Sequence, residues 1–356
     1  MKFNKIFFVF ILTAILFSCK KEDLKNPTPI SIETTKQINE FAIVIHGGAG
    51  YQTRESISPK LDSLVRNKLS EAITVGHNIL KNGGTSLDAV ENTIHVLENS
   101  PLFNAGKGAV YTNHETNEMD ASIMDGATLN AGAVASVTHI KNPISAALQV
   151  MQHSGHIMLV GEGAEKFAKQ QGCKLVHASY FYDEERFQQL KQALQNNEVV
   201  LDHSRENNSL EGNIENGGRK MGTVGAVALD EHGNLAAATS TGGMTNKQFG
   251  RIGDTPIIGA GTYANNTTCA VSCTGHGEYF IKNVVAYDIS ALMEYKQLTL
   301  QEAANDVINE KLRHQNGEGG LIALDKNGNY SMSFNTEGMY RGVVTKDNEP
   351  KVEIYK

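Results

Sequence analysis

The sequence predicts an α+β fold in which two antiparallel sheets are packed between two layers of helices. Three observations support this prediction. Two helical segments follow the first strand, later strands are joined by short turns that contain glycine, and further helices lie between those hairpins. Elements in this order bury their apolar faces when helices cover the outer side of each sheet. The 356 residues, 40% hydrophobic and 20% charged, are enough for one large globular domain or two ordinary ones.

The first half of the folded region is predicted to begin with a strand and continue with helices. The apolar residues 41–45 predict a buried strand that runs into the glycine-rich loop HGGAG at 46–50. A helix begins at Ser58 and Pro59 and ends at 83–84, because proline suits a first turn and a glycine pair stops a helix. The next expected elements are a helix capped by Thr85 and Asp88, strands over 121–126 and 132–137, and helices over about 142–155 and 163–172.

The second half is predicted to hold a linker, two hairpins and two helices. Residues 183–222 are polar, rich in Asn, Gln and Glu, and predict a linker that is either disordered or functional. Apolar strands over 223–229 and 235–239 flank the turn DEHGN, and residues 322–330 repeat this hairpin pattern. Between the hairpins, one helix is expected around 280–292, and a second begins at a capping box of Thr299 and Glu302.

The first 40 residues are predicted to lie outside the fold. Two lysines followed by an apolar stretch describe a signal peptide over 1–18, and LFSC at 16–19 resembles the lipobox of bacterial lipoproteins. We therefore expect lipidation of Cys19, a polar tether over 19–40, and a membrane-anchored protein that faces the periplasm or the cell surface. The alternative is an ordinary signal peptide in which Cys19 is incidental.

Charge and cysteine content narrow the range of partners. The net charge of −7 argues against a nucleic-acid partner, which requires a clustered basic face. Apart from Cys19, the cysteines are Cys173, Cys269 and Cys273, an odd number without paired spacing. The last two lie inside apolar stretches, so they are expected to be buried thiols rather than a disulfide or a metal site.

The Gly222–Thr223 bond is the strongest candidate for chemistry, because an apolar strand begins abruptly on Thr223 after the polar linker. A strained peptide at Gly222 would expose its carbonyl to the Thr223 hydroxyl, and an N-to-O acyl shift followed by hydrolysis would free an amino group on Thr223. That amine, with a reference pKa of about 7.7 to 8.0, can act as general base for the hydroxyl of the same residue.

Three later motifs add the remaining groups for amide hydrolysis. TSTGGMTNK at 239–247 supplies hydroxyls and glycines, and GRIGDTP at 250–256 supplies a cation and a carboxylate for an amino-acid head group. VSCTGHGE at 271–278 precedes a helix, where a hydroxyl and backbone N–H groups can hold an oxyanion. Amide hydrolysis by Thr223 therefore requires no cofactor for catalysis.

Taken together, these motifs resemble the plant-type asparaginase and isoaspartyl peptidase family of N-terminal-nucleophile hydrolases. The motifs are IVIHGGAG, LFNAGKG, MDASIMDG, GTVGAVALD, TSTGGMTNK, GRIGDTPIIGAG and SCTGHGE, in this order between Ile43 and Gly342. The resemblance implies a four-layer αββα sandwich that is cut into an α subunit, residues 41–222, and a β subunit, residues 223–356. It also implies an (αβ)2 homodimer and the hydrolysis of β-aspartyl dipeptides and L-asparagine.

The resemblance assigns roles to individual residues. Thr223 is the implied nucleophile, Thr241 hydrogen-bonds it, Thr274 and the Gly275 N–H form the oxyanion hole, and Asn104 supports the site. Arg251 is implied to hold the substrate α-carboxylate and Asp254 its α-amino group. The full implied substrate site is Arg251, Ile252, Gly253, Asp254, Thr274, Gly275, His276 and Gly277. A structural Na⁺ is implied in the loop 97–107, bound by backbone carbonyls of Leu97, Glu98, Ser100, Phe103, Ala105 and Lys107.

Several of these residues can also be interpreted without the family. Without the family, Thr241 and Thr274 could be ordinary turn hydroxyls, and Arg251 with Asp254 could be a solvated ion pair. His46 could be a base, but a nucleophile with its own amine does not need one, so a structural role is favoured.

Two other functions would also fit parts of this sequence. A glycosylasparaginase would use the same nucleophile, but HGGAG is typical of the plant-type branch, and Gly222 stands where glycosylasparaginases carry an aspartate. An inactive small-molecule-binding lipoprotein is disfavoured because every matched site residue is present.

Overall fold

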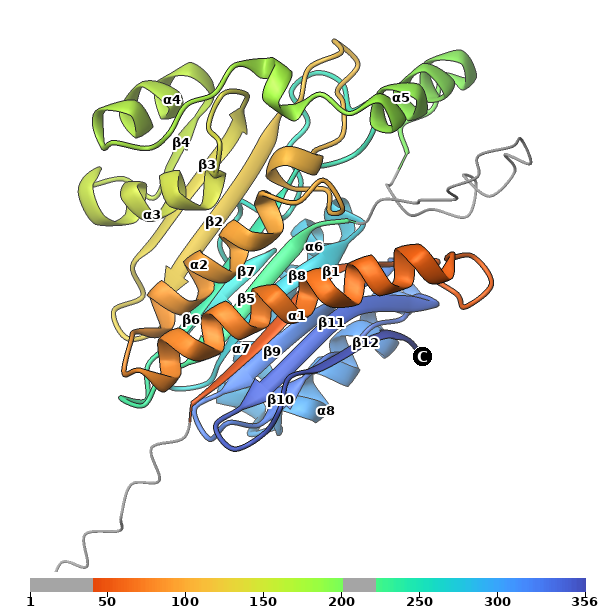
Figure 1. The fold of residues 1–356 in the computed structure, drawn as a ribbon. Helices are drawn as coiled ribbons and strands as arrows, with labels where there is room; N and C mark the ends of the chain where they lie inside the picture. Colours follow the sequence, from red (N-terminus) through yellow and green to blue (C-terminus); the bar gives the residue numbers. More distant parts are fainter. Residues whose placement is uncertain (1–40, 201–221) are drawn as a thin grey trace, which may run out of the picture. The chain divides into compact units, whose positions relative to one another are not determined.

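The computed structural model describes residues 41–200 and 222–356. The predicted signal peptide, Cys19, the tether and most of the polar linker lie outside the described residues. The described residues form four layers, with helices on the outer side of each of two sheets (Figure 1). The four-layer αββα arrangement expected from the sequence is therefore confirmed. Within the described ranges, no helix has the length and apolar character needed to cross a membrane.

The larger sheet has eight strands in the order β12-β11-β1-β5-β6-β2-β3-β4. All pairings are antiparallel except that between β3 and β4, which is parallel, so this sheet departs from the expected pattern at its edge. The strand bounds are β1 Ala42–Gly50, β2 Met119–Asp125, β3 Ala131–Val137, β4 Met158–Val160, β5 Val224–Leu229, β6 Leu235–Thr241, β11 Gly338–Thr345 and β12 Lys351–Tyr355.

The smaller sheet has four antiparallel strands in the order β10-β9-β8-β7. Its strands are β7 Thr262–Ala264, β8 Cys269–Gly275, β9 Gly319–Asp325 and β10 Tyr330–Ser331. The helices are α1 Pro59–Lys81, α2 Ser86–Glu98, α3 Pro143–His153, α4 Gly161–Gln170, α5 Glu184–Asn196, α6 Gly277–Asn283, α7 Val285–Lys296 and α8 Leu300–Asn305, the last continued by a π-helical segment over Asp306–Leu312. Short 3-10 turns lie at Gly106–Gly108 and Ala178–Phe181.

Three apolar cores separate the four layers. The first lies between the larger sheet and the helices α1, α2 and α3, and includes Ile43, Ile73 and Ile94. The second lies between the two sheets, and the third lies between the smaller sheet and the helices α6 to α8. Strands that are buried on both faces read as continuous apolar runs, which is why β1 and β5 were recognisable in the sequence.

Four helix and strand predictions require correction. The strand β1 does not end at Ile45 but continues through HGGAG, with an irregularity in its pairing between His46 and Gly48. The expected helix over 280–292 is two helices, because Val284 takes a left-handed conformation with φ of 51° and ends the first of them. The strands β11 and β12, which complete one edge of the larger sheet, were not predicted.

The fourth correction concerns the polar linker. Its first part forms the helix α5, capped by Asp183, whose side chain accepts a hydrogen bond from the backbone N–H of Arg186. Leu190 and Ala193 are buried on one face of this helix, and Phe187 packs edge-on against Tyr111. A few apolar residues at helical spacing were enough to fix a helix in an otherwise polar sequence.

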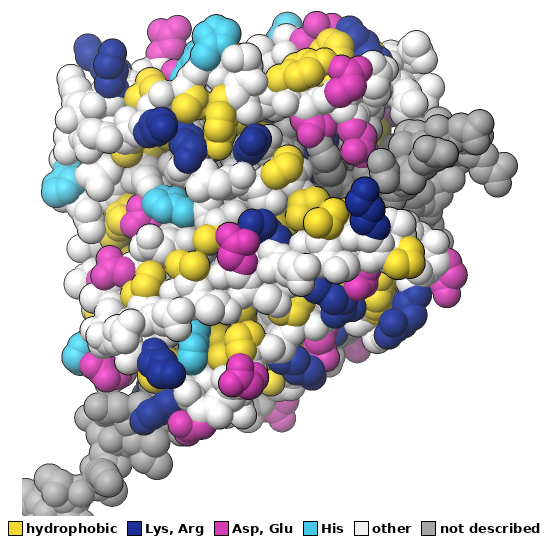
Figure 2. All heavy atoms as spheres, viewed as in Figure 1, with side chains coloured by type: hydrophobic (Ala, Val, Ile, Leu, Met, Phe, Trp, Pro, Cys, Tyr) yellow, Lys and Arg dark blue, Asp and Glu magenta, His cyan; other side chains and the backbone are white. Residues whose placement is uncertain are grey.

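The surface seen over the outer helices carries charges of both signs. On this face, Lys and Arg side chains alternate with Asp and Glu, and among the described residues neither sign forms a continuous patch (Figure 2).

Candidate active site

Thr223 lies at the beginning of β5 and faces a pocket. The pocket encloses about 360 Å³ of space, part of it open to solvent. Its lining residues come from segments far apart in the sequence: Asn104, Gly222, Thr223, Thr241, Gly243, Met244, Arg251, Gly253, Asp254, Thr255 and Gly275. Four of the residues expected at the site are not among those that line this pocket: Ile252, Thr274, His276 and Gly277.

The hydroxyl of Thr223 is oriented by Thr241. Thr223 Oγ1 donates to Thr241 Oγ1 over 3.0 Å, and the latter also accepts the backbone N–H of Gly243 at 3.0 Å. Because β5 and β6 form an antiparallel hairpin, the start of one strand meets the end of the other. This contact agrees with the role expected for Thr241 and disfavours an ordinary turn hydroxyl.

Asn104 holds the loop that follows Thr241. Its side-chain Nδ2 donates to the carbonyl of Gly243 at 2.7 Å, and its Oδ1 accepts the N–H of Val110 at 3.0 Å. The backbone carbonyl of Asn104 also accepts the N–H of Gly242 at 2.9 Å. Asn104 is 1% exposed, so these bonds lie in a low-dielectric surrounding where they fix the loop firmly.

Thr274 and Gly275 lie at the end of β8, as an oxyanion hole would require. Thr274 Oγ1 is buried and has no hydrogen-bond partner among the residues that the structure describes. A buried hydroxyl without a partner is costly, and an incoming oxyanion would satisfy it. Gly275 has φ of +151°, and a β-carbon there would lie 2.4 Å from the carbonyl oxygen of Glu318, so only glycine fits.

Arg251 and Asp254 lie on either side of Gly277. A β-carbon at Gly277 would be 2.9 Å from both Arg251 Nη2 and Asp254 Oδ1, so the two charged groups approach the same point. Burial raises the pKa of Asp254 to about 7, although the charge of Arg251 opposes the shift. Its Oδ2 has no hydrogen-bond partner within the described ranges. A buried carboxylate with an unused oxygen, next to a guanidinium, suits the two charges of an amino-acid head group.

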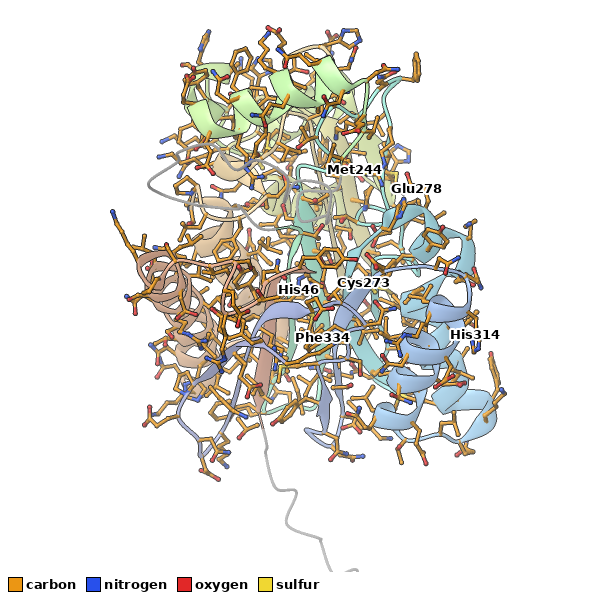
Figure 3. All side chains as sticks on the ribbon, turned by 90° about the vertical axis from the view of Figure 1, so that its right-hand side faces the viewer. His46, Met244, Cys273, Glu278, His314 and Phe334 are labelled. Carbon is orange, nitrogen blue, oxygen red and sulfur yellow. The ribbon has the colours of Figure 1, made fainter. Side chains whose placement is uncertain are left out.

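Glu278 accepts hydrogen bonds from two of the guanidinium nitrogens of Arg251. Arg251 Nε and Nη2 each donate to a carboxylate oxygen of Glu278 at 3.0 Å. His276 Nε2 lies 3.3 Å from the same carboxylate, so Glu278 contacts both Arg251 and His276. Arg251 and Asp254 are therefore not a solvated ion pair with each other, since the arginine pairs with Glu278 and the aspartate is 5% exposed. Glu278 and Met244 lie toward the same end of the sheets (Figure 3).

Three site features were not anticipated. Gly48 has φ of +114°, and a β-carbon there would lie 2.5 Å from the backbone nitrogen of Gly222, so β1 passes directly beside the Gly222–Thr223 bond. Met244 lines the pocket. Asp120 lies opposite Thr241 in the sheet and is fully buried, and burial raises its pKa against the opposing charges of Lys247 and Arg251. All three residues lie in motifs quoted from the sequence (HGGAG, TSTGGMTNK and MDASIMDG), but their positions at the site depend on the fold.

His46 contacts the backbone of Thr223 and not its hydroxyl. His46 Nδ1 lies 3.0 Å from the carbonyl oxygen of Thr223, and Nε2 lies 3.0 Å from Ser272 Oγ. Burial lowers the pKa of His46 to about 3, so the ring is neutral and a poor proton acceptor at neutral pH. The favoured structural interpretation of His46 agrees with these contacts.

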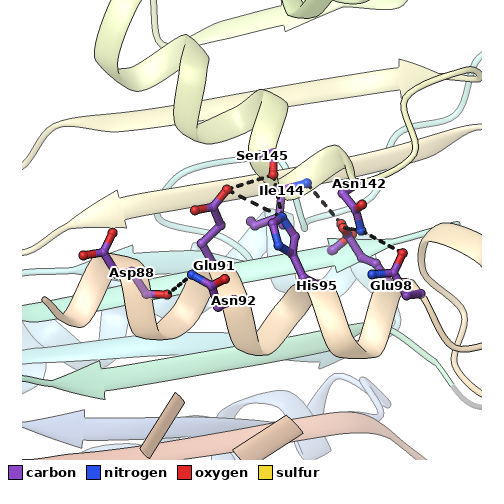
Figure 4. A network of polar contacts seen from close by, with 10 residues as sticks. Asp88, Glu91, Asn92, His95, Glu98, Asn142, Ile144 and Ser145 are labelled. Atoms are coloured by element: carbon purple, nitrogen blue, oxygen red, sulfur yellow. Dashed lines mark hydrogen bonds and ion pairs between the residues drawn. The ribbon is translucent and has the colours of Figure 1, made fainter. Parts of the chain in front are cut away.

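The loop 97–107, where a structural Na⁺ is expected, is tightly packed. A β-carbon at Gly106 would lie 2.4 Å from the carbonyl oxygen of Glu98, and one at Gly108 would lie 2.0 Å from that of Phe103. The carboxyl group of Glu98 is buried, which raises its pKa to about 7, and it accepts hydrogen bonds from Ser240, Asn142 and the backbone of Ile144 (Figure 4). Backbone carbonyl oxygens are donors that suit a hard cation, and the Na⁺ expected here stays a prediction.

Comparison with known proteins identifies the family. The sequence profile described as asparaginase matches residues 39–354. The chain belongs to the asparaginase family. It is 51% identical over 319 residues to the isoaspartyl peptidase of Escherichia coli K12, covering 90% of this chain and 97% of that protein. It is 51% identical over 327 residues to a putative isoaspartyl peptidase/L-asparaginase of Dictyostelium discoideum, covering 86% and 94% of the two chains.

Similarity extends to animals. The isoaspartyl peptidase/L-asparaginase of Mus musculus is 41% identical over 328 residues, covering 90% of this chain and 92% of the mouse protein. The resemblance drawn from seven short motifs is thereby confirmed for almost the whole folded part of the asparaginase-family chain.

Proposed function

We propose that this protein is an amidohydrolase that cleaves isoaspartyl dipeptides and L-asparagine with Thr223 as the nucleophile. The observation that carries the proposal is one pocket in which the Thr223 hydroxyl, aligned by Thr241, faces both Arg251 and Asp254. The names of the relatives, isoaspartyl peptidase and L-asparaginase, support the same substrates and do not favour a glycosylasparaginase or an inactive binding protein.

Activation begins with cleavage of the chain. Thr223 Oγ1 attacks the carbonyl carbon of Gly222, the bond from that carbon to the Thr223 nitrogen breaks, and an ester replaces the amide. Water then hydrolyses the ester, which leaves a carboxylate on Gly222 and a free amino group on Thr223. Gly48 allows β1 to lie against Gly222 without a side chain in the way.

Hydrolysis of substrate uses the new amine. The Thr223 amino group accepts the proton of Oγ1 while Oγ1 attacks the side-chain amide carbon of the aspartyl unit. Thr274 Oγ1 and the N–H of Gly275 donate to the developing oxyanion. The amine returns the proton to the leaving nitrogen, so ammonia or an amino acid departs. Water, deprotonated by the same amine, then releases L-aspartate and regenerates Thr223.

The roles of Arg251 and Asp254 set the substrate requirements. Arg251 binds the α-carboxylate through the N–H groups that Glu278 leaves unused, and Asp254 binds the α-ammonium group. Blocking either group on the substrate removes a charge-assisted contact and leaves the partner unpaired, so kcat/KM falls by roughly tenfold to a hundredfold.

Three further features belong to the proposal. Na⁺ bound by the carbonyls of loop 97–107 would rigidify the segment that carries Asn104. The cleaved units would form an (αβ)2 dimer, which sedimentation would measure. Lipidation of Cys19 would anchor the protein, and Cys19→Ser would then release it from membranes.

The test combines a mass measurement with three substrates. Purified protein is expected to give two chains under denaturing conditions, the smaller beginning at Thr223, and to hydrolyse β-Asp-Leu and L-asparagine. Thr223→Ala is expected to remain one chain and to be inactive. Full activity in an uncut chain would contradict the mechanism, and preference for a glycosylated asparagine would contradict the substrate assignment.

A further inference from the structure

A row of polar residues crosses the larger sheet directly behind the active site, between the two sheets. In this row, His46 on β1 pairs with Gly225 on β5, which pairs with Thr239 on β6, which pairs with Ser122 on β2. Facing them across the intersheet space are Ser272 on β8 and Thr262 on β7, which pair with each other in the smaller sheet. The three side chains of this row and the two that face it are all 0% exposed: His46, Ser122, Thr239, Thr262 and Ser272. Figure 3 shows His46 between the sheets.

These side chains form a continuous chain of close polar contacts between side-chain atoms. His46 Nε2 lies 3.0 Å from Ser272 Oγ, and Ser272 Oγ lies 2.7 Å from Thr239 Oγ1. Thr262 Oγ1 donates to Thr239 Oγ1 at 2.6 Å, and Ser122 Oγ lies 2.7 Å from Thr262 Oγ1.

Both ends of the chain are backbone carbonyls of the active site. At one end, His46 Nδ1 lies 3.0 Å from the carbonyl oxygen of Thr223. At the other end, Ser122 Oγ donates its one hydrogen to the carbonyl oxygen of Thr255, the residue after Asp254, at 2.6 Å. Its 2.7 Å contact with Thr262 Oγ1 then carries no hydrogen while Thr262 donates to Thr239. The chain therefore joins the nucleophilic residue to the segment that carries Asp254.

The Thr223 carbonyl determines which group donates in each hydrogen bond between Thr223 and Thr262. A carbonyl oxygen only accepts, so His46 Nδ1 must carry the hydrogen that Thr223 receives. Nε2 of the neutral ring is then an acceptor, which requires Ser272 to donate to it. Ser272 consequently accepts from Thr239, which accepts from Thr262. The tautomer of His46 that carries its hydrogen on Nδ1 thus satisfies both the Thr223 carbonyl and the Ser272 hydroxyl.

Gly225 provides the space for this arrangement. A β-carbon at position 225 would lie 2.1 Å from His46 Nε2 and 2.1 Å from Ser272 Oγ. The bond between His46 and Ser272 therefore occupies the volume that a side chain on Gly225 would fill. Val227 lies two residues after Gly225 on the same face of β5 and packs in the apolar core between the sheets. Apolar side chains alone can therefore fill the space between the sheets next to this site.

We propose that His46, whose Nδ1 donates to the Thr223 carbonyl and whose Nε2 accepts from the buried Ser272 hydroxyl, is a positioning residue for Thr223. This inference rests on the proposed function, in which Thr223 is the nucleophile. After cleavage, no covalent bond holds Thr223 on its N-terminal side. Its hydroxyl is held by Thr241, and its carbonyl is held by His46. Two contacts on opposite sides of the residue fix the direction in which the amine and hydroxyl point.

The same chain sets where Thr223 lies relative to the substrate head group. Because it spans both sheets and ends beside Asp254, a shift of one sheet against the other would break several buried hydrogen bonds at once. Loss of His46 is therefore expected to misalign attack more than it weakens binding, which lowers kcat and leaves KM nearly unchanged.

The experiment compares four single variants and one double variant. The fraction of each that is cleaved at Thr223 is measured first, so that kcat refers to cleaved enzyme. His46→Leu and Gly225→Ala are expected to lower kcat for L-asparagine at least about tenfold, with KM within about twofold. Their effects should not add in the double variant, because both remove the same contact. In His46→Asn, the side-chain Nδ2 takes the place of Nδ1 and should restore most of kcat. Val227→Ala is the control, expected to lower the melting temperature without changing kcat.

The outcomes separate this inference from the proposed function. Wild-type protein that hydrolyses neither L-asparagine nor β-Asp-Leu contradicts the proposed function. If the wild type is active, a cleaved His46→Leu enzyme with unchanged kcat overturns the positioning role. So does a folded His46→Asn enzyme as impaired as His46→Leu, since a role limited to core packing would give no rescue. If His46→Leu fails to fold, Gly225→Ala and His46→Asn still decide the question by the same kcat comparison.

Discussion

The pH dependence of substrate recognition is expected to follow the ionisation of Asp254. Burial raises the pKa of this carboxyl group to about 7, against the opposing charge of Arg251. Only the ionised form pairs with a substrate α-ammonium group. With a pKa near 7, roughly one-tenth of the enzyme carries an ionised Asp254 at pH 6 and roughly nine-tenths at pH 8. Recognition of the ammonium group should therefore improve about tenfold across this interval.

The assay must separate Asp254 from the Thr223 amine, which titrates in the same range. Succinamate is L-asparagine without its α-amino group, so it needs the Thr223 amine and Arg251 but not an ionised Asp254. The ratio of kcat/KM for L-asparagine to kcat/KM for succinamate cancels the shared titrations. We expect this ratio to rise about tenfold from pH 6 to pH 8, and to lose its pH dependence in Asp254→Asn. A ratio that stays constant in the wild-type enzyme would refute the reasoning.

The same pKa shift has the opposite effect on stability. Because the pKa of Asp254 is higher in the folded state than the usual value of 3.8, the folded protein binds more protons between pH 4 and pH 7. The free energy of unfolding therefore falls as pH rises through that window, by the linkage between proton binding and folding. Asp254→Asn should flatten this fall, which denaturant titrations at pH 5 and pH 7.5 would measure. At neutral pH, the ionised carboxylate of Asp254 therefore lowers the stability of the fold, while it is the form that binds the substrate α-ammonium group.

Further predictions follow from single contacts. Thr241→Val removes the acceptor of the Thr223 hydroxyl and should lower kcat about tenfold, whereas a KM effect alone would argue against an orienting role. Gly48→Ala places a methyl group against Gly222 and strains a φ of +114°, so a denaturing gel should show slower cleavage; unchanged cleavage would mean that β1 yields easily. Replacing Na⁺ by choline at constant ionic strength should lower the melting temperature if loop 97–107 binds Na⁺, and an unchanged value would count against the site.

Local patterns predicted the elements whose signals lie close together in the sequence. The capping residues Ser58, Thr85 and Thr299 each accept the hydrogen bond expected at a helix start. The helix break at Val284 was missed because a β-branched residue with positive φ has no local signal. The helix α5 was missed because its burial depends on Tyr111, far away in the sequence, which Phe187 contacts.

Some contacts of the candidate site could likewise be predicted from the sequence, and others could not. The pair Thr223 and Thr241 could be predicted, because strand pairs such as Val224 with Ser240 and Leu229 with Leu235 are symmetric about His232 in the hairpin turn. The same symmetry places Thr223 opposite Thr241. The contact of His46 with Thr223 could not be predicted, since 177 residues separate them and only the position of β1 beside β5 brings them together. The family resemblance supplied Arg251 and Asp254, whereas their positions around Gly277 required the structure.

The strand order also predicts what cleavage at Thr223 does to the assembly. Strands β1 to β4 precede the cut and strands β5, β6, β11 and β12 follow it, yet β1 lies between β11 and β5, and β2 lies beside β6. The two fragments therefore share backbone hydrogen bonds along three strand pairs, β1 with β11, β1 with β5, and β2 with β6, and they share the apolar cores on both sides of the larger sheet. Because cutting one bond just before the start of β5 removes none of these contacts, the fragments should stay together in native size-exclusion chromatography and separate only in denaturant. Fragments that separate under native conditions would mean that the paired strands do not hold the cleaved chain together.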